Sequence, residues 1–363
     1  MLTIEETKRA ALSYHALARV DFVELPVLRR GDRVAVLSPS KALPEVFPDV
    51  YEQGLSRLRH LFGLEPVEYP STTRQSSFKE RARDLHAAFA DPTIKGIIST
   101  IGGDDQIRLL PHLDPEVISR CPKPFFGYSD NTNLGLYLWN LGIPSYYGGA
   151  IMTQFALSGG MHPLTVTGLQ RAFFERGRHE ITPPDHYIDR YRDWSNKEEL
   201  ALPPITHPSA GWIWNGAASA RGRLWGGCLE IIDWQLEANH WLPSIERLQG
   251  CILCLETSEE MPAAPVVEQV LLKLGERGII GGAAGLLMGR PKAWEWNKAL
   301  SPGESAAYTE AQHEAVLSVF RRYNTNAPMV LDVDFGHTDP QPILPLGGIV
   351  EIDGLNRRLF LNY

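Results

Sequence analysis

Short apolar segments alternate with segments of helical spacing between residues 33 and 141, and this alternation constrains the fold more than any other feature. Each apolar segment suits one buried strand and ends in polar or glycine-rich residues that begin a turn. We expect strands at 33–37, 95–101 and 124–127, and helices at 51–61, 106–113 and 133–141. Such an order is typical of an α/β domain with a mainly parallel sheet, whose ligand site lies beyond the carboxyl ends of the strands.

The sequence changes character near Pro183, where a second part of the chain is expected to begin. Residues 183–220 are polar, contain several prolines and carry three tryptophans, as expected for a linker or lid. Beyond it we expect strands at 250–255 and 328–332, helices at 266–275 and 309–323, and an apolar segment at 285–289. The expected division is an N-terminal extension (1–30), an N-terminal α/β domain (31–182), the linker (183–220) and a C-terminal domain (221–363).

The overall charge bears on the partners of the protein. The 363 residues carry a formal net charge of −8, so nucleic acid and anionic membrane surfaces would meet net repulsion. The first residues are acidic where a secretory signal would be basic and then apolar, and the longest apolar stretch, 278–289, is too short to cross a bilayer. We therefore expect a cytoplasmic protein that binds neither nucleic acid nor a membrane.

The sequence contains no recognisable motif for a metal or a cofactor. Cys251 and Cys254 lie in an expected buried strand, where residues three apart point to opposite faces, and no second cysteine pair completes a zinc site. The first expected strand is followed by Ser38-Pro-Ser-Lys instead of a glycine-rich dinucleotide motif, and no His-Glu-x-x-His cluster occurs. We expect neither a metal nor a cofactor.

Ser129 stands where the strand at 124–127 meets the next helix. A sharp strand-to-helix turn lifts a serine hydroxyl out of the sheet and points backbone N–H groups and the positive end of the helix dipole toward it. The alternative is a plain helix cap, because Ser129 to Thr132 are all standard N-cap residues and the Gly-x-Ser-x-Gly pattern is not met. Local sequence leaves both interpretations open.

Two later loops supply the other groups that a serine nucleophile needs. Glu256 and His337 each follow an apolar strand, and with Ser129 they provide a hydroxyl, a general base and an orienting carboxylate. Taken singly, Glu256 is also suited to capping its turn, and His337 is one of eleven histidines. The residues alone therefore leave two interpretations open, a serine hydrolase and a non-catalytic small-molecule binding protein.

Five motifs between residues 31 and 348 resemble those of the LD-carboxypeptidase family of serine peptidases, which includes muropeptide LD-carboxypeptidases and microcin C immunity peptidases. They are Ile101-Gly-Gly-Asp-Asp, Phe126-Gly-Tyr-Ser-Asp, Leu224-Trp-Gly-Gly, Leu253-Cys-Leu-Glu and Asp334-Phe-Gly-His, in that order. The resemblance implies an N-terminal α/β domain and a smaller C-terminal β-rich domain, with the catalytic residues split between them. It also implies a homodimer.

The resemblance assigns a role to each site residue. It implies Ser129 as the nucleophile, His337 as the general base, and Glu256 as the carboxylate that orients the imidazole. The backbone N–H groups of Gly103 and Asp130 would form the oxyanion hole.

The chain departs from the family pattern near the expected site. Many relatives carry an asparagine where this chain has Cys228, so a polar contact is expected to be missing. Glu259, Glu260 and Glu230 are weaker candidates for the orienting carboxylate.

The branches of the family differ in substrate. Muropeptide enzymes release a terminal D-alanine, whereas immunity peptidases cleave the amide joining a peptide or amino acid to an adenylate-like group. Trp194, Trp212 and Trp214 in the linker suit stacking on a nucleobase, worth about 1–3 kcal/mol per base, or packing of the domain junction. The residues of the Ile101-Gly-Gly-Asp-Asp motif and the long linker favour a peptidyl-nucleotide substrate, with the muropeptide activity as the alternative.

Overall fold

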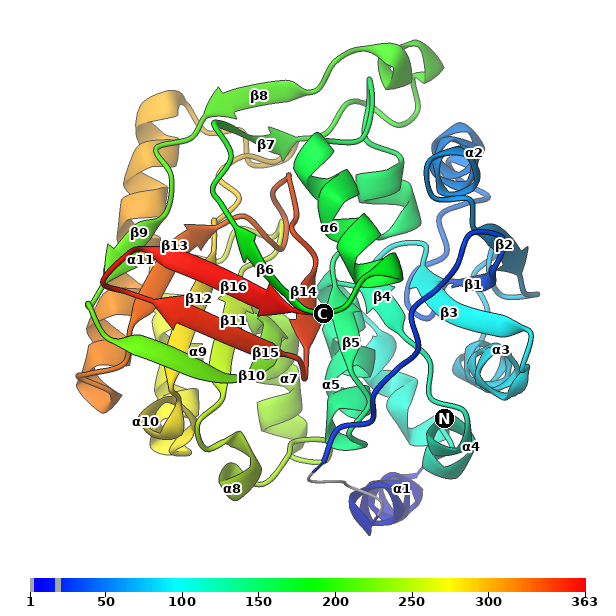
Figure 1. Cartoon of the computed structure of the whole chain (residues 1–363), viewed down its shortest axis with the longest axis horizontal. Helices are drawn as coiled ribbons and strands as arrows, with labels where there is room; N and C mark the ends of the chain where they lie inside the picture. Colours follow the sequence, from blue (N-terminus) through cyan, green and yellow to red (C-terminus); the bar gives the residue numbers. More distant parts are fainter. Residues whose placement is uncertain (1–2, 17–20) are drawn as a thin grey trace.

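The protein contains two large β-sheets (Figure 1). The computed structural model describes residues 3–16 and 21–363. The first sheet has the strand order β14-β5-β4-β3-β1-β2 and the second the order β6-β16-β15-β10-β11-β12-β13-β9. Both are rich in parallel pairs and carry helices between their strands, as the α/β prediction requires.

The first sheet is parallel except at one edge. Its parallel strands are β1 (Arg33–Leu37), β2 (Glu65–Glu68), β3 (Ile94–Ser99), β4 (Phe125–Gly127) and β5 (Ser145–Tyr147), and β14 (Leu344–Leu346) pairs antiparallel with β5. Its connecting helices include α2 (Pro48–Arg57), α3 (Phe78–Ala90), α4 (Pro115–Arg120), α5 (Thr132–Asn140) and α6 (Pro163–Phe174).

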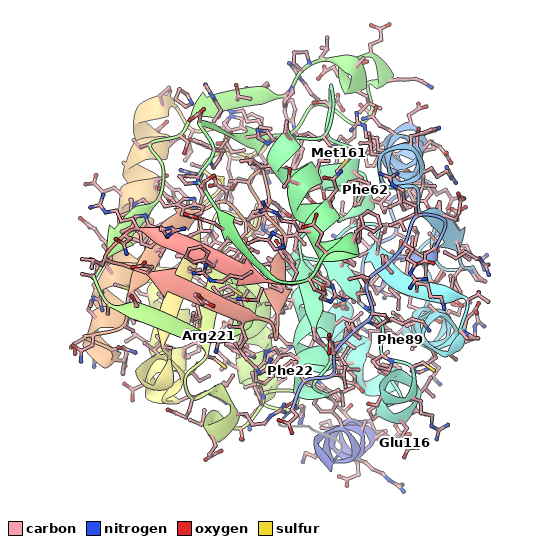
Figure 2. The ribbon with its side chains drawn as sticks, in the orientation of Figure 1. Phe22, Phe62, Phe89, Glu116, Met161 and Arg221 are labelled. Carbon is pink, nitrogen blue, oxygen red and sulfur yellow. The ribbon has the colours of Figure 1, made fainter. Side chains whose placement is uncertain are left out.

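Both faces of the first sheet are buried. Val34 and Val36 of β1 pack in the cluster that contains Phe62, whereas Ala35 packs in the cluster that contains Phe89. Figure 2 labels these two phenylalanines within the side chains that fill the right half of the molecule. Two-sided burial explains why inner strands such as β1 and β4 are apolar without alternation, whereas the edge strand β2 is polar and only partly buried.

The second sheet has a parallel centre and antiparallel flanks. Its central strands are β10 (Ser219–Cys228), β11 (Ile252–Glu256), β12 (Gly285–Gly289) and β13 (Met329–Val333), and its flanks are β15 (Ile349–Asp353), β16 (Arg358–Asn362), β6 (Arg178–Ile181) and β9 (Ile213–Asn215). Its helices are α7 (Leu229–Ala238), α8 (Ile245–Leu248), α9 (Ala264–Glu276), α10 (Ile279–Gly282) and α11 (Pro302–Tyr323).

The segment at 183–220 is more ordered than a linker. Strands β7 (His186–Arg190) and β8 (Ile205–Pro208) form a small sheet, and β9 joins the edge of the second large sheet. Strand β6 precedes residue 183 yet belongs to the second sheet, and β14 belongs to the first. Each expected domain therefore contributes one strand to the sheet of the other domain.

The N-terminal extension packs against the first domain. In α1 (Ile4–Ala16), Tyr14 is buried, stacks on Tyr137 with a centroid distance of 4.3 Å, and donates its hydroxyl to the carbonyl of Tyr137 at 3.0 Å. Across the described residues, no helix has both the length and the apolar character needed to cross a membrane.

Candidate active site

Ser129 lies at a strained turn between β4 and α5. It begins a short 3₁₀ turn and has φ of +62°, a left-handed conformation that costs a residue with a Cβ about 1–2 kcal/mol. The turn and α5 are preceded by Tyr128 and Asn131 as caps, and neither helix start uses the Ser129 hydroxyl as a capping acceptor. This geometry differs from that of a plain N-cap and matches a strand-to-helix elbow.

Gly102 lets a neighbouring loop approach the serine. A Cβ on Gly102 would lie 2.8 Å from Ser129 Cβ and 2.9 Å from its Oγ, which is closer than real Cβ contacts. The loop from Gly102 to Asp105 can therefore lie beside the hydroxyl only because this position has no side chain.

The Asp130 side chain holds this loop in place. Its carboxylate is buried and accepts hydrogen bonds from Ser40 Oγ and from the backbone N–H groups of Asp105 (3.0 Å) and Gln106 (2.9 Å). Burial raises the pKa of Asp130, although these hydrogen bonds oppose the rise. Within the described part of the chain, no hydrogen bond engages the backbone N–H of Gly103. The loop is thus fixed beside the elbow, and the backbone N–H of Gly103 has no acceptor among the described residues.

Glu256 and His337 form a buried pair from the second sheet. Glu256 ends β11, and its Oε2 accepts a hydrogen bond from His337 Nδ1 at 2.7 Å. A Cβ on Gly289 would lie 2.6 Å from Glu256 Cβ, so this glycine gives the carboxylate its space. A carboxylate on Nδ1 fixes the ring orientation and leaves Nε2 as the nitrogen that faces a substrate.

Tyr147 connects this pair to Ser129, and sequence reasoning missed it. Its hydroxyl donates to Glu256 Oε1 at 2.5 Å and accepts the backbone N–H of Ser129 at 3.2 Å. Tyr147 ends β5, which lies beside β4 in the first sheet. The signal in the sequence was a tyrosine, an aromatic residue with a hydroxyl, at the end of a strand. The serine backbone and the carboxylate are joined through one buried hydroxyl.

His337 Nε2 is already occupied. It lies 2.9 Å from Oε2 of Glu259, whose side chain is half exposed, and the hydrogen bonds of the described residues include none between His337 and the Ser129 hydroxyl. Burial disfavours protonation of His337, but the charges of Glu256 and Glu259 outweigh burial and raise its pKa well above the ordinary value. For Glu259, burial is likewise outweighed by His337, which lowers the pKa of this carboxyl.

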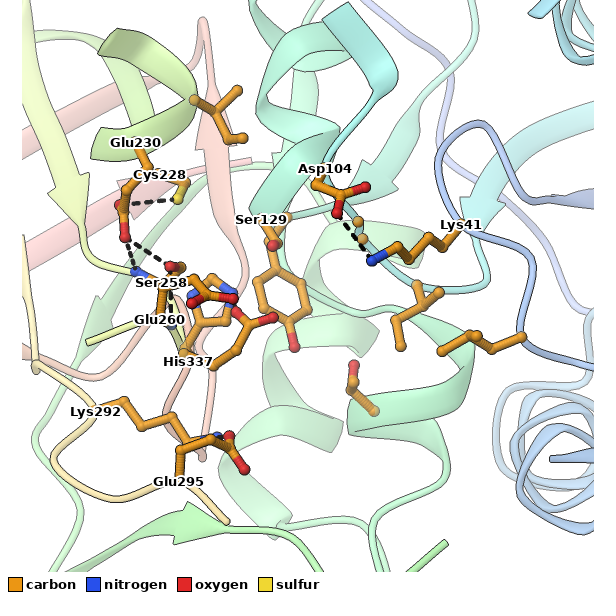
Figure 3. Close-up of a pocket in the computed structure, with 18 of the residues that line it drawn as sticks. Lys41, Asp104, Ser129, Cys228, Glu230, Ser258, Glu260, Lys292, Glu295 and His337 are labelled. Carbon is orange, nitrogen blue, oxygen red and sulfur yellow. Dashed lines mark hydrogen bonds and ion pairs between the residues drawn. The ribbon is translucent and has the colours of Figure 1, made fainter. Parts of the chain in front are cut away.

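A cavity of about 480 Å³ contains both Ser129 and His337 in its wall (Figure 3). Gly103 and Trp194 also line it. The size is within the range of small-molecule sites, about 300–1,000 Å³. The structure thus brings together chemistry-bearing residues from both sheets.

Trp212 and Trp214 lie elsewhere. Trp212 donates its Nε1–H to Asp334 Oδ2 at 2.7 Å, and both rings pack against the core of the second sheet instead of lining the cavity. Burial raises the pKa of Asp334 to about 6, although the charge of Arg290 opposes it. Of the three linker tryptophans, only Trp194 is placed to meet a ligand there.

The other acids take distinct positions. Glu230 accepts hydrogen bonds from the backbone N–H (3.0 Å) and hydroxyl (2.6 Å) of Ser258 and from Cys228 Sγ (3.3 Å). Glu260 follows Glu259 in the turn after β11. Glu256 is therefore the carboxylate on His337 Nδ1, and Glu259 occupies the opposite nitrogen.

Comparison with known proteins identifies the family of the chain. The family model of the LD-carboxypeptidase N-terminal domain matches residues 34–148, and the model of the LD-carboxypeptidase C-terminal domain matches residues 221–352. The chain belongs to the LD-carboxypeptidase family. Membership identifies the protein as a peptidase-type hydrolase and confirms the resemblance inferred from the five motifs.

Relatives and solved structures extend over most of the chain. A putative carboxypeptidase of Vibrio cholerae is 27% identical over 337 residues, covering 89% of this chain and 93% of the relative. The microcin C7 self-immunity protein MccF of Escherichia coli is 28% identical over 294 residues, covering 79% of each. The MccF-like protein from Streptococcus pneumoniae, solved in complex with AMP, is 28% identical with a TM-score of 0.80, covering 92% of this chain and 99% of that protein.

Proposed function

We propose that the protein is a serine peptidase that hydrolyses an amide through an acyl-enzyme. In this mechanism Ser129 Oγ attacks the carbonyl carbon while His337 Nε2 takes the hydroxyl proton and then gives it to the departing amine. Water, activated by the same imidazole, releases the acyl group. The backbone N–H groups of Gly103 and Asp130 stabilise the oxyanion, and Glu256 holds the ring.

One observation carries the proposal: a strained serine and a buried histidine on a carboxylate line the same cavity from two different sheets. Such an arrangement is unfavourable for folding alone, because Ser129 adopts a left-handed conformation and Glu256 is fully buried. The mechanism requires His337 Nε2 to leave Glu259 and face Ser129 before attack.

The substrate we propose is an aminoacyl or peptidyl compound joined to an adenylate-like group. Trp194 in the cavity wall supports this choice, because an indole offers a stacking face to a nucleobase. The similarity to MccF, and the AMP bound to the Streptococcus pneumoniae relative, support it further.

The test compares the wild type with Ser129→Ala on two substrates. Each protein is incubated with an aminoacyl sulfamoyl adenosine and, separately, with an L,D-linked muramyl tetrapeptide, and products are identified by mass spectrometry. Release of sulfamoyl adenosine by the wild type alone supports the proposal. Release of D-alanine alone moves the protein to the muropeptide activity, and turnover by Ser129→Ala excludes the serine mechanism.

A further inference from the structure

Carboxylates outnumber ammonium groups around the cavity. The lysines and carboxylic acids that line it are Lys41, Asp104, Glu230, Glu259, Glu260, Lys292 and Glu295. Lys41 pairs with Asp104 at 3.0 Å and Lys292 with Glu295 at 2.6 Å, so both lysines already have a carboxylate. Figure 3 shows the first pair on one side of Ser129 and Glu230 on the other.

Three carboxylates remain, and their situations differ. Burial raises the pKa of Glu230, while hydrogen bonds from Ser258 hold this carboxylate inside the wall. Glu259 and Glu260 instead project from the turn after β11, and among the described ion pairs neither carboxylate meets a lysine or arginine. The ammonium of Lys298 donates to the backbone carbonyl of Glu260. Among the described ion pairs, Glu260 therefore has no cationic partner and Glu259 has only His337.

The contact between Glu259 and His337 ties this charge to the chemistry. Oε2 of Glu259 lies 2.9 Å from Nε2, the nitrogen that must be neutral and face Ser129 during attack. Once His337 loses its proton, Glu259 loses its only cationic partner among the described ion pairs. A partly buried carboxylate without a partner is unfavourable unless a ligand supplies the cation.

We propose that the acyl part of the substrate carries a basic side chain in addition to its α-ammonium, and that Glu259 and Glu260 bind these two positive charges. A single α-ammonium offsets one carboxylate, and a lysine-like side chain offsets the second. Ile231 and Trp234 of α7 line the same cavity and suit the aliphatic stem of such a side chain. The inference rests on the proposed serine mechanism for its catalytic consequence.

Binding would exchange the partners of Glu259. The substrate ammonium takes the carboxylate, the imidazolium releases its Nε2 proton to water, and the neutral nitrogen turns to the Ser129 hydroxyl. Glu259 thereby links recognition of a cation to activation of the base, whereas Glu260 contributes recognition alone.

Binding to Ser129→Ala protein tests the charge preference without chemistry. Lysyl, norleucyl and glutamyl sulfamoyl adenosine are titrated by calorimetry; norleucine matches the stem of lysine without its charge. We expect the lysyl compound to bind about tenfold more tightly than the norleucyl compound, and the glutamyl compound to bind least. Equal or tighter binding of the norleucyl compound overturns the inference.

Turnover by the wild type then tests the two residues. We expect Glu259→Gln and Glu260→Gln each to lower the lysyl-to-norleucyl ratio of kcat/KM about fivefold, because each removes one charge from the binding site. Any change in the base caused by Glu259→Gln affects both substrates and cancels in the ratio.

Glu310→Gln removes an equal charge from an exposed position on α11 that does not line the cavity, and should leave the ratio unchanged. An unchanged ratio in both cavity variants overturns the inference. Absence of turnover of all three compounds by the wild type contradicts the proposed function instead, and the binding series still decides the charge preference.

Discussion

At the scale of single residues, the protonation of His337 sets the pH dependence of catalysis. Its pKa is raised by Glu256 and Glu259 against the opposing effect of burial, so the imidazole stays protonated to higher pH than an ordinary histidine. A protonated base cannot accept the Ser129 proton, and kcat/KM should therefore rise with pH along a limb above the ordinary histidine value of about 6.5. Glu259→Gln removes one of the two negative charges and should move this limb to lower pH.

The measurement is a pH profile of kcat/KM for the wild type, Glu259→Gln and Glu310→Gln. The Glu310→Gln profile should coincide with the wild type, which controls for overall charge. A limb that stays in place or moves to higher pH in Glu259→Gln would show that this carboxylate does not stabilise the imidazolium.

Tyr147 gives a second prediction at the residue scale. Tyr147→Phe keeps the buried ring but removes the hydroxyl that joins Glu256 to the backbone of Ser129. We expect kcat to fall about 10–100-fold with a smaller change in KM, because a misplaced base loses more in the transition state than in binding. Thermal unfolding measured beside the kinetics separates this effect from lost stability. An unchanged kcat would reduce Tyr147 to a packing role.

At the scale of elements, the close approach of the Gly102 loop to the elbow carries a prediction. A methyl group on Gly102 would overlap Ser129 Cβ and Oγ, so Gly102→Ala should displace the loop that carries the Gly103 N–H and abolish most turnover. The expected loss of about 10²–10³-fold is that of one oxyanion donor. Gly303→Ala is the matched control, because a Cβ there meets nothing within 4 Å, and it should keep full activity. Full activity in Gly102→Ala would exclude the proposed oxyanion hole.

The elements show which features could be predicted from sequence. Strand β11 and helices α5 and α9 lie within a few residues of their expected positions, because each has a clear apolar period and turn residues at its ends. Helix α11 begins at Pro302 instead of 309, since Ser301 and Glu304 form a capping box. The helix expected at 106–113 forms two short 3₁₀ turns.

Contacts between distant segments could not be predicted in this way. The motif resemblance pointed to Ser129, Glu256 and His337, and the structure places all three around one network. The hydroxyl of Tyr147 and the position of Glu259 on Nε2 depend on side chains that approach from elements far apart in the chain. Such contacts leave no periodic pattern of residues in the local sequence, so they can be recognised only in the folded chain.

At the scale of the whole molecule, the homodimer implied by the family resemblance stays a prediction. Light scattering of the purified protein should give twice the chain mass of 40.5 kDa. A mass equal to one chain at concentrations used for kinetics would show that the active form is a monomer. All the side chains assigned to the proposed mechanism come from one chain, so a monomer remains compatible with catalysis.

The last prediction follows from the way each half of the chain contributes a strand to the sheet of the other half. Ser129 comes from the first sheet and Glu256 from the second, so the site exists only while the sheets keep their relative position. One apolar cluster contains Tyr147 and Trp139 of the first part together with residues of β11, and Trp139 Nε1 donates to the carbonyl of Leu224 at 3.0 Å. A core shared in this way should make the two halves unfold together. Calorimetry of the Ser129→Ala protein should show one transition, with a van't Hoff enthalpy no smaller than the calorimetric enthalpy per mole of chain. Two resolved transitions would mean that the halves are independent, and that a substrate or a second subunit must align Ser129 with His337.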